Sequence, residues 1–170
     1  MKATKCLLIF ISILTLASCK KDDGGEDEFA LNNENLSGNY ELIFLQTVTV
    51  ETTEINGLQV VSTITSVGDT FQVDYFFTNN GEYTAAGLFR ILTTTVVNGE
   101  QTMEDAMIQD IDIDGNYTIT SSSSLLVLDG VTFEVTLFNE NQLRITRTEI
   151  DTFPNGDTVE FSEELRLIRQ

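Results

Sequence analysis

The sequence predicts an all-β fold, an antiparallel up-and-down barrel of about eight strands. Apolar and polar residues alternate with a two-residue period from about residue 36 onward. These runs are rich in Val, Ile, Thr, Phe and Tyr, which favour strands. Asn-Gly and Asp-Gly pairs separate many of the runs, and such pairs supply the positive φ angles of tight hairpins. A β-sandwich is the alternative that the same pattern allows.

The expected strands fill the predicted domain, residues 36–170, almost completely. They are 38–51, 59–66, 71–78, 82–97, 103–113, 117–128, 132–138, 142–150 and 159–169. The turns expected between them include Asn56-Gly57, Gly68-Asp69, Asn79-Asn80-Gly81, Asn98-Gly99, Asp114-Gly115, Asp129-Gly130 and Asn155-Gly156. One helix candidate lies at 100–109, among strand signals. The strands carry too many charges for a lipid-facing band, so a membrane-spanning barrel is not expected.

The first eighteen residues have the pattern of an export signal. Lys2 and Lys5 precede an apolar run over 6–16, and Ala17-Ser18-Cys19 follows it. A basic start, a short apolar stretch and small residues before a cleavage site are typical of a secretory signal peptide. The run is shorter than the roughly 20 residues that a membrane-spanning helix needs. We therefore expect residues 1–18 to be removed on export.

Leu16-Ala17-Ser18-Cys19 also resembles the lipobox of bacterial lipoproteins. The resemblance implies that Cys19 is acylated, becomes the first mature residue, and anchors the chain in a membrane. Residues 19–35 then form a flexible acidic tether. Within it, Lys21-Asp22-Asp23 resembles the export signal of lipoproteins that reach the outer face of the Gram-negative outer membrane, although a solvated linker has similar charges. The implied location is the outer membrane, at the cell surface or on its periplasmic face.

A second resemblance begins where the first expected strand begins. Leu36-Ser37-Gly38-Asn39-Tyr40-Glu41-Leu42 is similar to the Leu-x-Gly-x-Trp-x-Leu opening of lipocalin-like domains. Residues 76–84 resemble the phenylalanine–polar turn–Gly-x-Tyr-Thr hairpin of the small bacterial members, and 115–119 and 141–145 resemble their later strand openings. This family implies a barrel that holds an apolar ligand at one open end. It also implies that Gly38 and Tyr40 close the floor, with Tyr40 in place of the family's Trp. Arg166 or Arg169 would then pack over the Tyr40 ring.

Composition excludes several classes of function. The chain has 27 Asp and Glu against 9 Lys and Arg, a net charge of −18, and no His. Nucleic acid would be repelled by this charge. Without His, Ser-His and Cys-His nucleophilic sites and most zinc sites are excluded, and heme loses its usual axial ligand. We therefore expect no cofactor and no enzymatic activity.

Two short motifs have both a functional and a structural interpretation. Asp110, Asp112 and Asp114 match the first half of a calcium loop, but Ser121 stands where its closing Glu belongs. The same alternation is typical of a strand with one exposed face, so we expect no metal site, and these three are the ligands to test if calcium binds. Asp157-Thr158-Val159 resembles an O-glycan acceptor of exported bacterial proteins, with modification expected on Thr158.

The sequence therefore favours a lipid-anchored, non-catalytic protein that binds a small apolar or amphipathic ligand. The alternative is a structural or accessory envelope lipoprotein whose packed barrel contacts a partner protein. The sequence identifies neither the ligand nor the partner. A solvent-connected apolar pocket larger than roughly 300 Å³ favours the first hypothesis, and a filled interior favours the second.

Overall fold

The computed structural model describes residues 29–170. Each strand pairs antiparallel with the next, and β8 pairs with β1, so a single sheet closes into a ring. The prediction of an all-β chain with about eight antiparallel strands is confirmed. The elements are α1 (Asn33–Leu36), β1 (Gly38–Ile55), β2 (Leu58–Phe77), β3 (Glu82–Val97), β4 (Glu100–Thr120), the 3-10 turn η1 (Ser121–Ser123), β5 (Leu125–Leu128), β6 (Val131–Phe138), β7 (Gln142–Thr152) and β8 (Thr158–Arg169).

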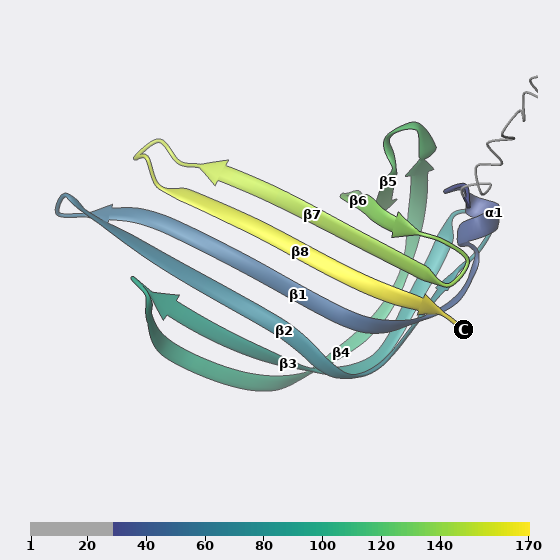
Figure 1. Ribbon diagram of the computed structural model, residues 1–170, viewed down its shortest axis with the longest axis horizontal. Coiled ribbons are helices and arrows are strands. Elements are labelled where there is room, and N and C mark those ends of the chain that lie inside the picture. The colour runs from purple at the N-terminus through teal and green to yellow at the C-terminus, as the bar shows by residue number, and fades with distance from the viewer. Residues whose placement is uncertain (1–28) are drawn as a thin grey trace, which may run out of the picture.

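The ring is complete at one end only, because β5 and β6 are short. They span 4 and 8 residues, whereas β2 and β4 span 20 and 21. Where β5 and β6 are present the sheet surrounds a core, and we call this part the closed half. Beyond it, β4, β3, β2, β1, β8 and β7 continue as a curved sheet with two free edges, the open half (Figure 1). The inner face of the open half is therefore continuous with the interior of the closed half.

Two expected turns are wrong, because long-range strand pairing overrides local turn chemistry. Gly68-Asp69 lies within β2, where a bulge between Asp69 and Gln72 replaces the turn. Asp114-Gly115 lies within β4, which pairs with β3 along its length from Glu100 to Asn116. The helix candidate at 100–109 is also part of β4. A ladder of this length outweighs the local preferences of a few residues.

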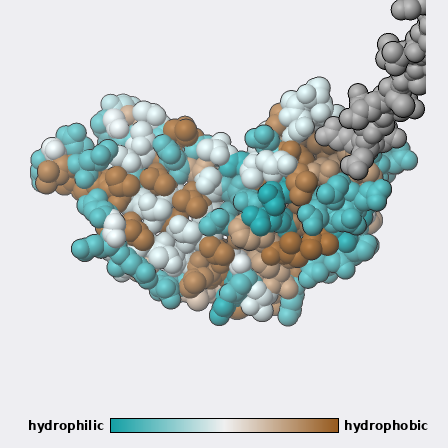
Figure 2. All heavy atoms as spheres, in the orientation of Figure 1, coloured by the Kyte–Doolittle hydropathy of each residue, from teal (hydrophilic) through white to brown (hydrophobic). Residues whose placement is uncertain are grey.

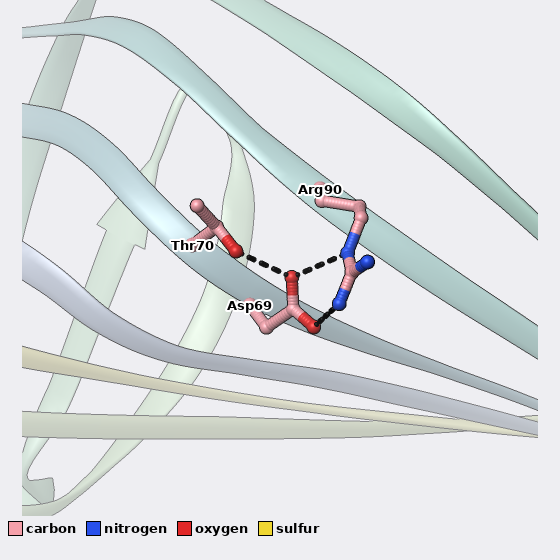
Figure 3. A network of polar contacts seen from close by, with 3 residues as sticks. All are labelled: Asp69, Thr70 and Arg90. Carbon is pink, nitrogen blue, oxygen red and sulfur yellow. Dashed lines mark hydrogen bonds and ion pairs between the residues drawn. The ribbon is translucent and has the colours of Figure 1, made fainter.

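The bulge in β2 is bridged to β3 by a polar network on the outer face of the sheet (Figure 3). The Asp69 carboxylate accepts hydrogen bonds from the Thr70 hydroxyl at 2.9 Å and from Arg90 Nε at 2.8 Å. The hydrogen bond from Arg90 lowers the pKa of Asp69, so this carboxylate stays ionised at neutral pH. Because the pair is exposed, it contributes little to the free energy of unfolding.

Aromatic side chains fill the closed half. Phe77 packs edge-on against Tyr40 and Tyr117, with ring centroids 5.6 and 5.4 Å apart, and stacks on Tyr83 at 5.8 Å. These four residues are at most 6% exposed. Edge-to-face and stacked pairs contribute about 0.5–1.5 kcal/mol each beyond the area they bury. The closed half is thus a packed core.

The folded unit begins earlier than the expected boundary at residue 36. The Phe29 ring lies 5.0 Å from that of Phe138, and Leu31 is buried. The Ser121 hydroxyl donates to the Leu31 carbonyl at 2.5 Å, and the Asn32 side chain caps α1. Residues 29–35 therefore belong to the fold rather than to a tether.

The signal peptide expected at 1–18 and the lipidation and export residues Cys19, Lys21, Asp22 and Asp23 lie outside the described residues. Within residues 29–170, no helix has the length and apolar character to cross a membrane.

Candidate binding site on the inner face

The floor of the closed half brings together Gly38, Tyr40 and Arg169. The Arg169 guanidinium lies over the Tyr40 ring, 4.8 Å from its centroid. It donates to the Ser37 carbonyl at 2.7 Å, to the Asn35 carbonyl and to the Tyr40 hydroxyl. Gly38 leaves room for it, because a Cβ there would lie 2.8 Å from Arg169 Nη1. This end of the ring is sealed.

Arg166, the other arginine expected near Tyr40, lies elsewhere. Its guanidinium packs over Phe44 at 4.2 Å on the outer face, and its Nε donates to Glu164 at 2.7 Å. The cause is the two-residue period of a strand, which turns Arg166 outward between the buried Leu165 and Leu167.

The three aspartates of the calcium-like sequence do not converge. Asp110, Asp112 and Asp114 lie exposed along one face of β4, where alternate residues are roughly 7 Å apart. In the part of the chain that the structure describes, no group of three His, Cys, Asp or Glu side chains is placed to hold a metal. Thr158, the glycan candidate, is the half-buried first residue of β8.

A stripe of side chains along β8, apolar except for Glu163, runs from the closed half onto the inner face of the open half. Leu167 and Leu165 are buried in the closed half, and Glu163, Phe161 and Val159 continue on the same face by alternation. The neighbouring strands place mainly polar residues beside them. The ladder partners are Thr47, Thr49 and Glu51 on β1 and Arg147, Glu149 and Asp151 on β7.

Arg147 lies at the mouth, where the closed half meets the open half, and contacts two aromatic rings and two carboxylates there. Its guanidinium lies between two rings, 4.7 Å from the Phe161 centroid and 5.6 Å from that of Phe133. Its Nε donates to Glu163 at 2.6 Å and its Nη1 to Glu149 at 2.9 Å. The side chains of Arg147 and Glu163 are only 23% and 15% exposed. Two ion pairs and two rings therefore hold Arg147 in one place.

The side-chain hydroxyl of Tyr75 lies near this mouth and forms no hydrogen bond among the residues that the structure describes. The residue is 7% exposed, and its ring stacks against both Phe77 and Tyr83, which also stack on each other. Burial, together with the negative charge of Glu163, raises the pKa of the Tyr75 hydroxyl to about 12. Within residues 29–170, the hydroxyls of Tyr40, Tyr83 and Tyr117 all form hydrogen bonds, whereas that of Tyr75 forms none. Among the described residues, the enclosed side-chain atoms without a partner are Arg144 Nε and Arg169 Nε, so the Tyr75 hydroxyl is not sealed off and is available to a ligand.

An apolar hollow lies at the far end of the same stripe. It has a volume of about 500 Å³ and forms where the β7–β8 turn meets the inner face. Val159 lies four residues from Glu163, so the hollow begins roughly 13 Å from the mouth. Figure 2 shows apolar side chains interspersed with polar ones along the open half, rather than gathered into one patch. The residues lining the hollow include Phe153, Pro154, Val159, Glu51 and Thr53.

The charges around the stripe select the kind of ligand. Glu163 lies in the stripe, Glu51, Glu149 and Asp151 flank it, and Arg147 is the one arginine beside them. The other arginines lie on the outer face or at the floor. Because Arg147 is already paired with two carboxylates, an anionic head group would meet excess negative charge. The site suits a neutral or cationic amphipathic molecule.

Sequence reasoning missed the three central residues of this site, Tyr75, Arg147 and Glu163. Each lies on an ordinary alternating strand, and no spacing distinguishes it from its neighbours. The one available signal was that Arg147 is a cation in an acidic segment. No family model, curated protein or solved structure matches the chain.

Proposed function

We propose that the protein is a lipid-anchored outer-membrane lipoprotein that binds a neutral or cationic amphipathic ligand without catalysis. The observation that carries the proposal is the inner face of the open half. It offers the Tyr75 hydroxyl, which has no hydrogen-bond partner within residues 29–170, at one end and an apolar hollow at the other. Because the closed half is filled, the ligand lies along this face instead of entering an enclosed cavity.

The lipocalin-like part of the proposal is supported by topology and by the floor. Eight strands follow in chain order around the ring, and Arg169 lies over Tyr40 where that family places an arginine over its Trp. The shortness of β5 and β6 departs from a complete barrel and leaves the mouth broad.

We expect a Tyr75→Phe variant to weaken binding of a neutral amphipathic dye, because it removes one hydrogen-bonding group and keeps the ring. Phenylnaphthylamine is the probe, titrated against the chain from Lys20 onward, and its fluorescence should rise on binding. Loss of one hydrogen bond predicts an affinity about two- to tenfold lower. Anilinonaphthalene sulfonate, an anionic dye of similar size, should bind less well than the neutral probe.

Tyr117→Phe is the matched control, since the Tyr117 hydroxyl already donates to the Thr78 carbonyl near the floor. It should leave the dye affinity unchanged. Equal effects of the two substitutions, or no fluorescence change with wild-type protein, would show that the inner face is not a binding site.

The anchor has its own test. In a Gram-negative host, Cys19→Ala should move the protein out of the membrane fraction, because the acyl chains supply the membrane affinity. Lys21→Ala/Asp22→Ala/Asp23→Ala should keep the membrane association but lose sensitivity to protease added to intact cells. Persistence of the Cys19→Ala variant in membranes would contradict the lipoprotein proposal.

A further inference from the structure

One edge of the open half is a long strand with a neighbour on one side only. β4 pairs with β3 from Glu100 to Asn116, but with β5 only from Tyr117 to Thr120. The stretch from Gln101 to Asp114 thus forms a free edge.

The backbone of this edge is oriented to receive another strand. At the point where β4 leaves the closed half, the Asn116 N–H donates to the Asp129 carboxylate and its carbonyl accepts from the Asp129 N–H. Alternate residues of an antiparallel strand direct both backbone groups to the same side. The backbone N–H and C=O groups therefore point away from β3 at every second residue, as they do at Asn116. These residues are Ile108, Asp110, Asp112 and Asp114.

Most of these outward-pointing backbone groups form no hydrogen bond with the described residues. The Ala106 N–H donates to the Asp105 carboxylate and the Asp110 carbonyl accepts from the Gln109 side chain. The N–H groups of Ile108, Asp110, Asp112 and Asp114 have no hydrogen-bond partner among the residues that the structure describes. They form a row of donors spaced by two residues, which is the geometry that an added strand requires.

Charge decides which strand can occupy the edge. Between Glu100 and Asn116 every charged residue is acidic and every acid is exposed. A second copy of β4 would add only further negative charge beside these acids, so pairing between copies is opposed. A segment rich in Lys and Arg would be attracted. The acids are Glu100, Glu104, Asp105, Asp110, Asp112 and Asp114.

Apolar side chains lie between the acids on both faces of the edge. Ile108 is 67% exposed on the outer face, and Met103 and Met107 are each 53% exposed on the inner face. An added strand that alternates basic and apolar residues would cover these side chains while its cations meet the carboxylates.

We propose that the free edge of β4 accepts an extended, basic segment of another protein as an additional strand. The occupant alternates Lys or Arg with β-branched or other apolar residues. This interaction uses the backbone and acids of β4 and does not depend on ligand binding at Tyr75.

Hydrogen exchange on the full chain in a non-ionic detergent tests the proposal. The probe is a peptide of about eight residues in which Lys and Val alternate. It should slow exchange of the amides at 104–114 by about tenfold or more at saturation, and leave β7 unchanged. A peptide in which Glu replaces Lys should give no protection, and a Lys-Val peptide N-methylated at every residue, which cannot donate backbone hydrogen bonds to β4, should bind at least about tenfold more weakly.

Two variants separate the backbone contribution from the charge. Ile108→Pro removes one outward N–H without touching the ladder to β3, and edge strands tolerate Pro at such positions. Asp110→Asn/Asp112→Asn/Asp114→Asn removes charge and keeps shape. Each should lower peptide affinity by about tenfold, whereas Glu54→Gln/Asp74→Asn/Glu160→Gln, which neutralises exposed acids elsewhere on the sheet, should change it by no more than about twofold.

The proposal fails if the Lys-Val peptide gives no protection at 104–114, because the acids then serve only to keep copies of the edge apart. It also fails if the N-methylated peptide binds equally well, because adsorption by charge alone would explain that result. Dye binding at Tyr75 is measured separately, so either conclusion can fail without the other.

Discussion

Gly87→Ala should destabilise the protein by about 3–5 kcal/mol, the largest effect that we expect from adding a single methyl group. Gly87 lies in β3, where it pairs with Val73 next to the bulge of β2, and has φ +135°. A Cβ there would stand 1.8 Å from the Gln72 carbonyl oxygen and 2.9 Å from the Val73 Cα. Because both are backbone atoms, β2 and β3 would have to separate at this point to make room for the methyl group.

Gly57→Ala is the matched control. Gly57 also has a positive φ, +78°, but it lies in the β1–β2 turn, where an added methyl group would meet no atom within 4 Å. The Gly57→Ala variant should lose only about 1 kcal/mol of unfolding free energy, because alanine adopts a positive φ less readily than glycine. Urea unfolding followed by circular dichroism measures both variants. Similar midpoints for the two would mean that β2 and β3 separate at little cost, contrary to the geometry.

The strand content was predictable because local signals and long-range pairing agree at most turns. Asn56-Gly57, Asn98-Gly99, Asp129-Gly130 and Asn155-Gly156 all connect consecutive strands, and each glycine adopts a positive φ. At Asp114-Gly115 the two disagree, and the ladder to β3 prevails. The absence of a side chain at Gly115 serves packing instead, since a Cβ would lie 2.6 Å from the Tyr83 ring.

The site was less predictable, because the face on which a residue lies depends on every irregularity before it. In β1 the pairing register with β8 shifts between Leu42 and Phe44. Leu42 and Leu45 consequently both face inward, and Phe44 lies outside beneath Arg166. A strict two-residue period from Tyr40 would place Phe44 inside and Thr47 outside. The division into closed and open halves likewise follows from the short ladders of β5 and β6. The sequence of one strand does not show how long its neighbours are, so this division could not be predicted.

Arg169→Ala should cost about 2–4 kcal/mol, the second large effect, because one side chain closes the floor through several interactions. The substitution leaves the carbonyls of Asn35 and Ser37 without this donor and removes the cation from the Tyr40 ring. Asn35 lies in the last turn of α1 and Ser37 directly follows the helix. Amide exchange in 29–37 should therefore accelerate more than exchange in β3. Urea unfolding and hydrogen exchange measure the two effects.

Arg169→Lys and Arg90→Ala identify the origin of that loss. Lysine keeps the charge but cannot reach three acceptors with a planar fork, so an intermediate stability is expected. Arg90 pairs with Asp69 on the exposed outer face, and its removal should cost at most about 1 kcal/mol. A lysine variant as stable as wild type would assign the effect to charge alone. An alanine variant no worse than Arg90→Ala would mean that packing of Tyr40 against Phe77 closes the floor without the guanidinium.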